Sequence, residues 1–489
     1  MEIPPVIKNQ KMLLFAISIA SFMSALDSSI VNIALPTIST SFDVSTGLVS
    51  WVSTMYLLVL TSCLMIFGKL SDRIGFRQIF LAGFLVFAAG SLFCALSPSF
   101  LILVGSRAVQ AVGGAMLGAI SMAMVSVFLP PGDRAKAIGF VVTMSSLGVA
   151  AGPFLGGILT EMLSWHWIFL INVPVGILAC ILGAAVIPSL PAREKTESFD
   201  SLGALYLFAM LGAFIYALNM GISLGFTSAP IIAAFVICIA GAVLFVRQER
   251  SAPDPLLDLQ LYRKRDFLFA NVGAMLMMFA YCGSNFLLPF FLEYVQGMST
   301  MVAGLYLTVP SVTLMLGGTM SGSLYHRFGP RKLCVGASAI YLLSFLLLST
   351  FGVATSTLLI ITTLALLGFG LGLYYSPNTS EIMCLAPREK QGMVSSLATT
   401  ERNAGATVGI VIFELAFIQS LITISSMKGL TEGSLATQPQ LVEALLASAF
   451  DIAFFVGAIV AFVVIILSFF THDPENVEEC DGEEAGMMA

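Results

Sequence analysis

Long apolar runs follow one another along almost the whole chain, and short stretches rich in Lys, Arg, Gly or Pro separate them. A helix needs about 20 apolar residues to cross the hydrocarbon core of a bilayer, and each run has about that length. The pattern therefore predicts an all-α membrane protein with 14 transmembrane helices. We place these helices at residues 12–35, 48–68, 79–97, 100–128, 137–161, 167–188, 201–221, 229–246, 267–291, 301–323, 333–351, 356–379, 393–424 and 447–470.

Composition indicates that lipid, rather than water, is the outer solvent. Of the 489 residues, 58% are hydrophobic and only 10% are charged, whereas soluble domains carry about 25% charged residues. The net charge of −6 argues against a nucleic-acid partner, which requires a basic surface. The eight Cys form no CxxC and the three His are scattered, so we expect neither a disulfide framework nor a metal site.

The basic residues predict the orientation of the chain in the membrane. The first apolar run contains Asp27 and many more runs follow it, so we interpret it as a retained helix rather than a signal peptide. With the N-terminus in the cytoplasm, all of the 22 Lys and Arg except Arg107, Arg402 and Lys428 fall in cytoplasmic segments or at their edges. We therefore expect a multi-pass protein of the inner cell membrane with both termini cytoplasmic.

Two loops of similar sequence indicate an internal repeat. Gly68–Gln78 and Gly322–Lys332 share Gly, Leu, Arg, Gly and Arg at equal offsets. The repeat predicts two six-helix bundles in the same orientation, at 1–188 and 267–471. The linker between them, 189–266, then carries two additional transmembrane helices. Two such bundles related by an axis along the membrane normal are a known transporter architecture, in which the substrate site lies between the halves.

A second similarity supports the repeat. Basic segments precede the helices predicted at 137–161 and 393–424, and each helix then carries two Gly four residues apart. Beyond the second bundle, residues 472–489 are acidic, and we expect them to form a solvated cytoplasmic tail.

Four stretches resemble the major facilitator superfamily, and specifically its fourteen-helix drug–proton antiporter branch. Leu26–Pro36 is similar to the signature of that branch in the first helix, and Gly68–Gln78 is similar to the cytoplasmic loop motif of the superfamily. Arg107–Ala115 resembles the membrane-embedded Arg-x-x-Gln-Gly element, and Gly148–Gly157 resembles the antiporter motif. The resemblance covers essentially the whole chain and implies the major facilitator fold.

The chain also departs from the family pattern. Ala111 stands where the Arg-x-x-Gln-Gly element has Gly, and Phe76 stands at a position that is commonly basic. His326 replaces the acidic residue in the second copy of the loop, so that loop is expected to form a weaker gate. Residues 301–323 contain no acidic residue, although some relatives carry one there, and this disfavours a site for multiply charged cations.

Asp27 and Arg107 are the candidate proton-coupling residues. An ionised group in mid-membrane is costly and is by default functional. Both residues lie about 20 Å from the cytoplasmic side, counted at 1.5 Å per residue, so they could share one cavity. A change in their separation or hydration would load and unload a proton. The alternative is structural, with Asp27 anchoring its helix and Arg107 bonding neighbouring helices.

The loop Gly68–Gln78 is the candidate cytoplasmic gate. Gly68 and Gly75 permit a close approach and a tight turn. Asp72 could accept bonds from a helix N-terminus or an Arg, while Arg73 and Arg77 could pair with acids of a neighbouring loop. Such contacts form in one state and break in the other. The alternative is that these basic residues only fix the topology.

The helix predicted at 137–161 carries the candidate antiporter motif. Gly148, Gly152 and Gly156 share one face, where small residues let another helix approach closely. Pro153 removes a backbone hydrogen bond and bends the helix, and Gly157 lies beside it. The assignment to exporters rests on the resemblance, and ordinary helix packing is the alternative.

Two acids in the helix predicted at 393–424 are secondary proton or cation candidates. Glu401 and Glu414 lie within this apolar span. Arg402 follows Glu401 directly, but adjacent helical residues point about 100° apart and need not pair. Three further acids lie near predicted outer helix ends, where solvation at the interface explains them: Glu161, Glu293 and Asp451.

The resemblance implies a proton-coupled antiporter that exports amphipathic small molecules or drugs by alternating access. Its partners would be a small amphipathic substrate, protons and membrane lipid, and it would act as a monomer. The proton gradient would supply the energy, without a cofactor. An exporter of one endogenous metabolite on the same fold is the nearest alternative. An enzyme is not expected, because no nucleophile elbow, phosphate loop or metal cluster occurs in the sequence. A membrane-embedded protein without transport activity is less favoured.

The predicted orientation can be tested by thiol labelling in intact cells. A Cys introduced next to Lys428 should react with an impermeant reagent from outside, because the loop that holds it is extracytoplasmic. A Cys introduced next to Lys264 should react only after the membrane is opened. The reverse pattern would overturn the orientation.

Overall fold

The protein is helical throughout the part of the computed structural model that is described. This part comprises residues 10–129, 131–188, 201–251, 261–385, 391–427 and 439–470. The side chains of Asp72, Arg73 and His326 lie outside it. No strand occurs among the described residues, and 13 of their helices are long and apolar enough to cross a membrane. The predicted span 201–221 is also helical, with a shorter apolar stretch at Leu205–Leu218. The prediction of an all-α membrane protein is confirmed with 13 of its spans, and a fourteenth span on this helix agrees with its length.

The chain divides into two compact units, residues 1–255 with 288–308 and residues 256–287 with 309–489. The boundaries of the predicted six-helix bundles stay a prediction. Up to residue 255 the helices are α1 (Gln10–Phe42), α2 (Thr46–Val49), α3 (Trp51–Ile74), α4 (Phe76–Ala95), α5 (Phe100–Phe128), α6 (Pro131–Met162), α7 (Trp167–Leu170), α8 (Asn172–Val186), α9 (Ser201–Leu224) and α10 (Ala229–Ser251). The later helices are η1 (Leu261–Arg263), α11 (Arg265–Phe290), η2 (Phe291–Val295), α12 (Thr300–Phe328), α13 (Pro330–Leu348), α14 (Thr357–Cys384), α15 (Gln391–Met427) and α17 (Pro439–Phe470).

Many hydroxyl side chains inside the spans donate to carbonyl oxygens of their own helices. Ser18, Thr61 and Ser338 each donate to the carbonyl oxygen four residues earlier, at 2.7–2.8 Å. In lipid no water is available for an unpaired polar group, so local bonds of this kind make the polar residues tolerable. The short connections are capped in the usual way, since Ser356 accepts a bond from the backbone N–H of Leu359 at the start of α14.

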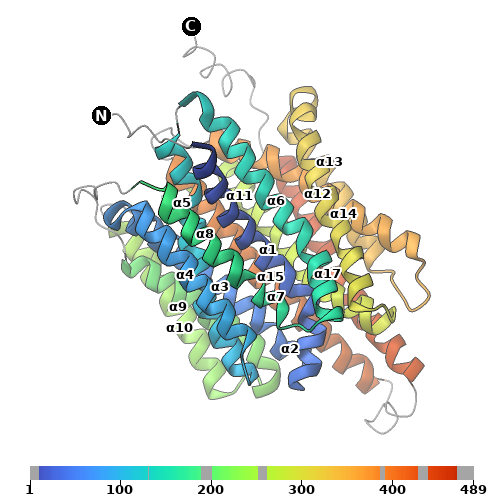
Figure 1. Ribbon diagram of the computed structural model, residues 1–489. Coiled ribbons are helices and arrows are strands. Elements are labelled where there is room, and N and C mark those ends of the chain that lie inside the picture. The colour runs from blue at the N-terminus through green and yellow to red at the C-terminus, as the bar shows by residue number, and fades with distance from the viewer. Residues whose placement is uncertain are drawn as a thin grey trace. The chain divides into compact units, whose positions relative to one another are not determined.

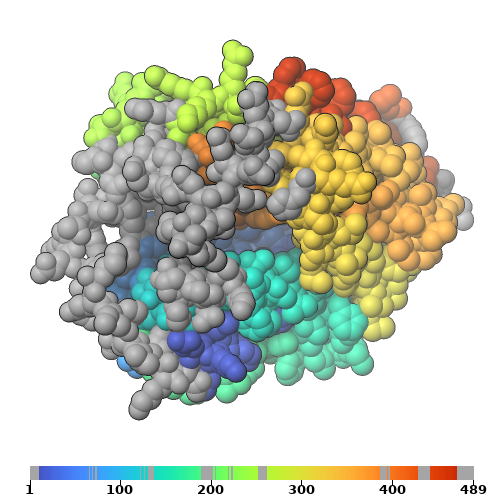
Figure 2. All heavy atoms as spheres, turned by 90° about the horizontal axis from the view of Figure 1, so that it is seen from above, coloured from blue at the N-terminus to red at the C-terminus, as the bar shows by residue number. Residues whose placement is uncertain are grey.

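Helices α1 and α6 run parallel and lie side by side in the first unit (Figure 1). The space-filling view has the first turns of α1 (dark blue) beside α6 (teal) on one face (Figure 2). Glycines make this contact possible. A Cβ atom on Gly148 would lie 2.5 Å from the carbonyl oxygen of Phe22, and one on Gly152 would lie 2.6 Å from Cβ of Ser29. The glycine face predicted on this helix therefore packs against α1.

The second unit repeats this packing. Glycines of α15, Gly405 and Gly409, press against the carbonyl oxygens of Met275 and Phe279 in α11, so closely that a Cβ atom would collide with them. The structural repeat thus follows the sequence repeat, with α11 in the place of α1 and α15 in the place of α6.

The two repeated loops turn at equivalent glycines. Gly75 separates α3 from α4 with φ of 105°, and Gly329 separates α12 from α13 with φ of 77°. An L-residue with a side chain rarely adopts these angles, so Gly is required at both turns. The predicted tight turn at Gly75 is confirmed.

The close contact between α1 and α6 predicts a difference between two Gly→Ala variants of the same helix. Gly152→Ala should lower the stability of the protein by about 1–3 kcal/mol, since overpacking forces the helices apart. Gly139→Ala is the matched control, because nothing lies within 4 Å of its Cβ position. Thermal unfolding in detergent measures the difference. Equal melting temperatures for the two variants would show that the glycine face is not required for the contact.

Candidate functional site

Asp27 lies in the middle of α1 and is completely buried, with an exposed fraction of 0%. Its carboxylate accepts three hydrogen bonds. Oδ2 accepts from Nη1 of Arg107 at 2.7 Å. Oδ1 accepts from Nε2 of Gln110 at 2.7 Å and from Nδ2 of Asn172 at 2.9 Å. The predicted proximity of Asp27 and Arg107 is confirmed, although they form a closed polar cluster and are not open to solvent.

Arg107 is held on every side. It is 1% exposed, and its Nε donates to the carbonyl oxygen of Val52 in α3 at 3.0 Å. Its guanidinium lies 4.1 Å from the ring centroid of Tyr56 and 5.6 Å from that of Phe169, within reach of cation–π attraction. The rings shield the charge from lipid, and Asp27 neutralises it.

Gln110 joins the two charged groups, since it lies one helical turn after Arg107. Its Oε1 accepts from Nη1 of Arg107 at 2.6 Å, while its Nε2 donates to Asp27 and, at 2.8 Å, to Oγ of Ser91. Both ends of the amide are therefore used, and its orientation is fixed. Ser91 and Gln110 are themselves 0% exposed.

Gln110, Asn172 and Ser91 were not predicted as members of this cluster. A signal existed for two of them, because Gln110 belongs to the Arg-x-x-Gln-Gly element and Asn172 interrupts an apolar run. All three bonds to Asp27 come from donors, one of them a cation. In this conformation, the cluster is a sealed, overall neutral ion pair.

The candidate gate is described only in part. Gly68 has open space around its Cβ position, and Gly75 makes the turn. The side chains of Asp72 and Arg73 lie outside the described residues. Among the described residues, the recorded partner of Arg77 is the carbonyl oxygen of Ala184, near the end of α8, to which Nη2 donates at 2.8 Å.

The candidate antiporter motif faces two partners. Gly148, Gly152 and Gly156 pack on α1, as described above. The next residues of α6 meet the segment 288–308 of the same unit, where Gly157 lies against Thr300 and Met301. The carboxylate of Glu161, at the end of α6, accepts from the backbone N–H of Met301 at 2.7 Å. Pro153 lies within α6, and its carbonyl oxygen presses against Gly304.

The secondary acids lie in the second unit. Glu401 accepts a hydrogen bond from the hydroxyl of Tyr262, which lies in η1 before the first span of this unit. Burial, together with the neighbouring Glu401, raises the pKa of the Tyr262 hydroxyl. Arg402 does not need Glu401 as a partner, because it donates to Thr399 at 3.1 Å and lies over the ring of Tyr375.

Glu414 is 2% exposed and lies further along α15.

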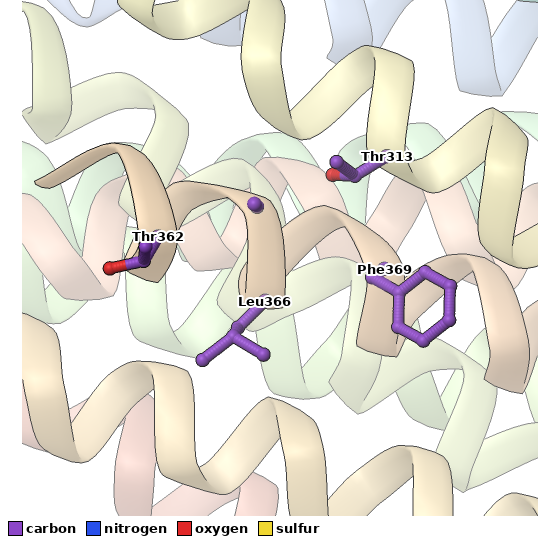
Figure 3. Close-up of a pocket in the computed structure, with 5 residues that line it drawn as sticks. Thr313, Thr362, Leu366 and Phe369 are labelled. Atoms are coloured by element: carbon purple, nitrogen blue, oxygen red, sulfur yellow. The ribbon is translucent and has the colours of Figure 1, made fainter. Parts of the chain in front are cut away.

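The second unit contains an apolar cleft of about 350 Å³ between α12 and α14 (Figure 3). Its two hydroxyls donate to carbonyls of their own helices, so the cleft offers little to orient a polar ligand. It is lined by Thr313, Thr362, Ala365, Leu366 and Phe369.

Comparison with known proteins gives consistent matches. The Major Facilitator Superfamily model matches residues 17–410. The riboflavin transporter RibZ of Clostridioides difficile is 32% identical over 467 residues, which are 95% of this chain and 98% of that protein. The multidrug resistance protein Stp of Mycobacterium tuberculosis is 32% identical, over 83% of this chain and 75% of its own length. A bacterial homologue of the lysosomal transporter Spinster, solved in an inward-facing, unoccupied conformation, matches with a TM-score of 0.69 and 16% identity, over 94% of this chain and 96% of that structure.

The buried pair predicts strong energetic coupling between Asp27 and Arg107. Arg107→Met should destabilise the protein by about 3–5 kcal/mol, because it leaves a buried carboxylate without its cation. Combining it with Asp27→Asn should recover part of that loss, since both charges are then gone. Chemical unfolding in detergent, followed by tryptophan fluorescence, measures the cycle. Simply additive losses would mean that the two charges do not stabilise each other.

Proposed function

Because the chain belongs to the Major Facilitator Superfamily, a family of membrane transporters, we propose that it is a proton-coupled antiporter that exports amphipathic small molecules by alternating access. The observation that carries the proposal is the ion pair of Asp27 and Arg107, with exposed fractions of 0% and 1% in the interior of the first unit. Ionisable groups at such depth are costly and are retained where they move protons or ions.

Proton coupling follows from what the cluster needs in each state. In the closed cluster, the carboxylate of Asp27 accepts a hydrogen bond from each of three donors. A proton can reach it only after an element of the cluster moves and lets water in. Once protonated, the acid no longer attracts Arg107 strongly, so the protonated state favours a different arrangement of the helices. Substrate binding in that arrangement would then be linked to the proton.

The antiporter motif supports this mechanism by its position. Its glycine face contacts α1 from Phe22 to Ile33, on both sides of Asp27 along the helix. A helix pair that packs through small residues can shift without losing many side-chain contacts. A shift of α1 on α6 would change the distance from Asp27 to its donors, which lie on α5 and α8.

The gate has the complementary role in the proposal. Gly68, Asp72, Arg73, Gly75 and Arg77 would form contacts in one state that break in the other. Arg77 already ties the start of α4 to the end of α8. Glu401 and Glu414 would be secondary proton or cation sites.

A second candidate function is the transport of one metabolite. It is favoured by the match to the riboflavin transporter, which extends over 95% of this chain, whereas the match to Stp extends over 83%. Riboflavin is itself a flat amphipathic molecule, so it belongs in the substrate panel beside amphipathic cations.

The remaining parts of the proposal concern energy source and setting. The proton gradient is the energy source, with no cofactor, and the protein is not an enzyme. It acts as a monomer in the inner cell membrane, with lipid around its apolar surface and both termini in the cytoplasm. Its partners are the small substrate and protons, not nucleic acid.

The test is transport into everted vesicles with and without a pH gradient, using ethidium as the amphipathic cation and riboflavin as the metabolite. Asp27→Asn should abolish gradient-driven accumulation, because no proton can be carried. Exchange of substrate down its own gradient should survive, because exchange needs conformational cycling but no net proton movement.

Glu443→Gln provides the control, since this acid lies in α17, outside the cluster of Asp27. Full gradient-driven accumulation by Asp27→Asn would refute the role of Asp27 and make Glu401 or Glu414 the next candidates. Accumulation of riboflavin alone would support the single-metabolite function.

A further inference from the structure

Asn172 is the one residue of α8 that bonds to Asp27. It is the first residue of the helix, directly after the break that separates α7 from α8, and it is 1% exposed. Its Nδ2 lies 2.9 Å from Oδ1 of Asp27. Among the described residues, no other hydrogen bond of this side chain is recorded.

The two amides around Asp27 differ in their freedom. Gln110 cannot turn over, because its Oε1 is held by Nη1 of Arg107 at 2.6 Å and its Nε2 also bonds to Ser91. A reversed Gln110 would place an N–H against a cation. No such partner holds Oδ1 of Asn172 within the described part of the chain. A rotation of this amide about its terminal bond therefore breaks only its bond to Asp27.

The two protonation states of Asp27 make opposite demands. An ionised carboxylate only accepts hydrogen bonds, whereas a protonated one carries an O–H that must find an acceptor. A buried O–H without an acceptor is costly. Two nearby oxygens already accept a bond each, since the carbonyl of Val52 accepts from Arg107 and Oγ of Ser91 accepts from Gln110. An amide can meet both demands, because it has a donor at one end and an acceptor at the other.

We propose that Asn172 is a positioning residue that remains hydrogen-bonded to Asp27 in both protonation states, with Nδ2 facing the carboxylate and Oδ1 facing the acid after the amide turns. The inference rests on the proposed role of Asp27 as proton carrier. It assigns Asn172 the task of keeping the acid satisfied while Arg107 is released.

The charged and titratable groups that face Asp27 come from three other helices. Arg107 of α5, Tyr56 of α3 and Cys94 of α4 interact electrostatically with Asp27. Of these, Arg107 only donates. On α6, Gly152 and the carbonyl of Val149 contact Ser29, two residues after Asp27. The amide of Asn172 is a neutral group that carries both a donor and an acceptor and is already hydrogen-bonded to Asp27.

The test replaces Asn172 by an apolar residue of similar shape. Asn172→Leu removes a bond from both states, but bonds to a charged group are the stronger ones, so the protonated state gains in relative terms. The pH profile of substrate transport should move upward by about one pH unit. Asn271→Leu is the matched control. That residue is equally buried, its Nδ2 bonds only within its own helix to Phe267, and its Oδ1 has no partner.

Infrared difference spectroscopy of purified protein, recorded across a pH step, gives a second readout. A carboxylic acid C=O band that is absent in Asp27→Asn reports protonated Asp27. In Asn172→Leu this band should move to higher frequency, because the O–H has lost its acceptor, while Asn271→Leu should leave it in place.

Different results would refute the proposed function and the role of Asn172. Absence of the Asp27 band in the unmodified protein would refute proton binding by Asp27, and with it the proposed function. A band that is present but unchanged in Asn172→Leu, with an unchanged pH profile, would overturn the role of Asn172 alone. Should Asn172→Leu fail to fold, Asn172→Ser, which keeps a donor and an acceptor on a shorter side chain, should shift both readouts less than Asn172→Ala does.

Discussion

A carboxylate in the interior of an apolar helix bundle must be neutralised and hydrogen-bonded, and the first unit is organised around that requirement. Asp27 receives a cation from α5 and amide donors from α5 and α8, and the cation is held in turn by α3. With Ser91 of α4, which accepts from Gln110, five helices contribute to one buried network. In a medium without water, each of these hydrogen bonds stabilises the cluster only while the others are also formed. The cluster therefore ties the positions of the helices to the charge on one side chain.

Helix α1 also packs closely against the backbone of α6, so α6 is the element relative to which α1 and its Asp27 would shift. At Gly148 and Gly152, α6 lies so close to α1 that an added Cβ atom would collide with α1. Helix α8 has contacts at both ends, with Asn172 on Asp27 and the carbonyl of Ala184 on Arg77. Asn172 and Ala184 lie about 18 Å apart along a straight helix. A rigid element of this kind connects the charged cluster with the turn at Gly75, where the repeated loop lies.

Much of this could be predicted from the sequence. Apolar run length located the helices, and counting residues from the helix ends placed Asp27 and Arg107 at the same depth. The glycine spacing identified the face of α6 that packs closely, although not its partner. Neutral amides were missed, because Asn172 and Gln110 carry no charge that would mark them as costly in a membrane. The division of the span 167–188 into α7 and α8, and the bond from Tyr262 to Glu401, depend on contacts between distant segments that no local pattern encodes. The second unit repeats the helix packing, whereas the ion pair of Asp27 and Arg107 belongs to the first unit, so the sequence repeat alone did not indicate where the pair lies.

The central claim is that Asp27 exchanges its proton against substrate. The most direct measurement is the proton release that accompanies substrate binding to the purified, detergent-solubilised protein in weakly buffered solution, read with a pH indicator as ethidium or riboflavin is added. At a pH where Asp27 is partly protonated, the unmodified protein should release protons in proportion to the bound substrate, and Asp27→Asn should bind substrate without releasing any. Equal proton release by both proteins would contradict the account, because the exchanged proton would then reside on another group.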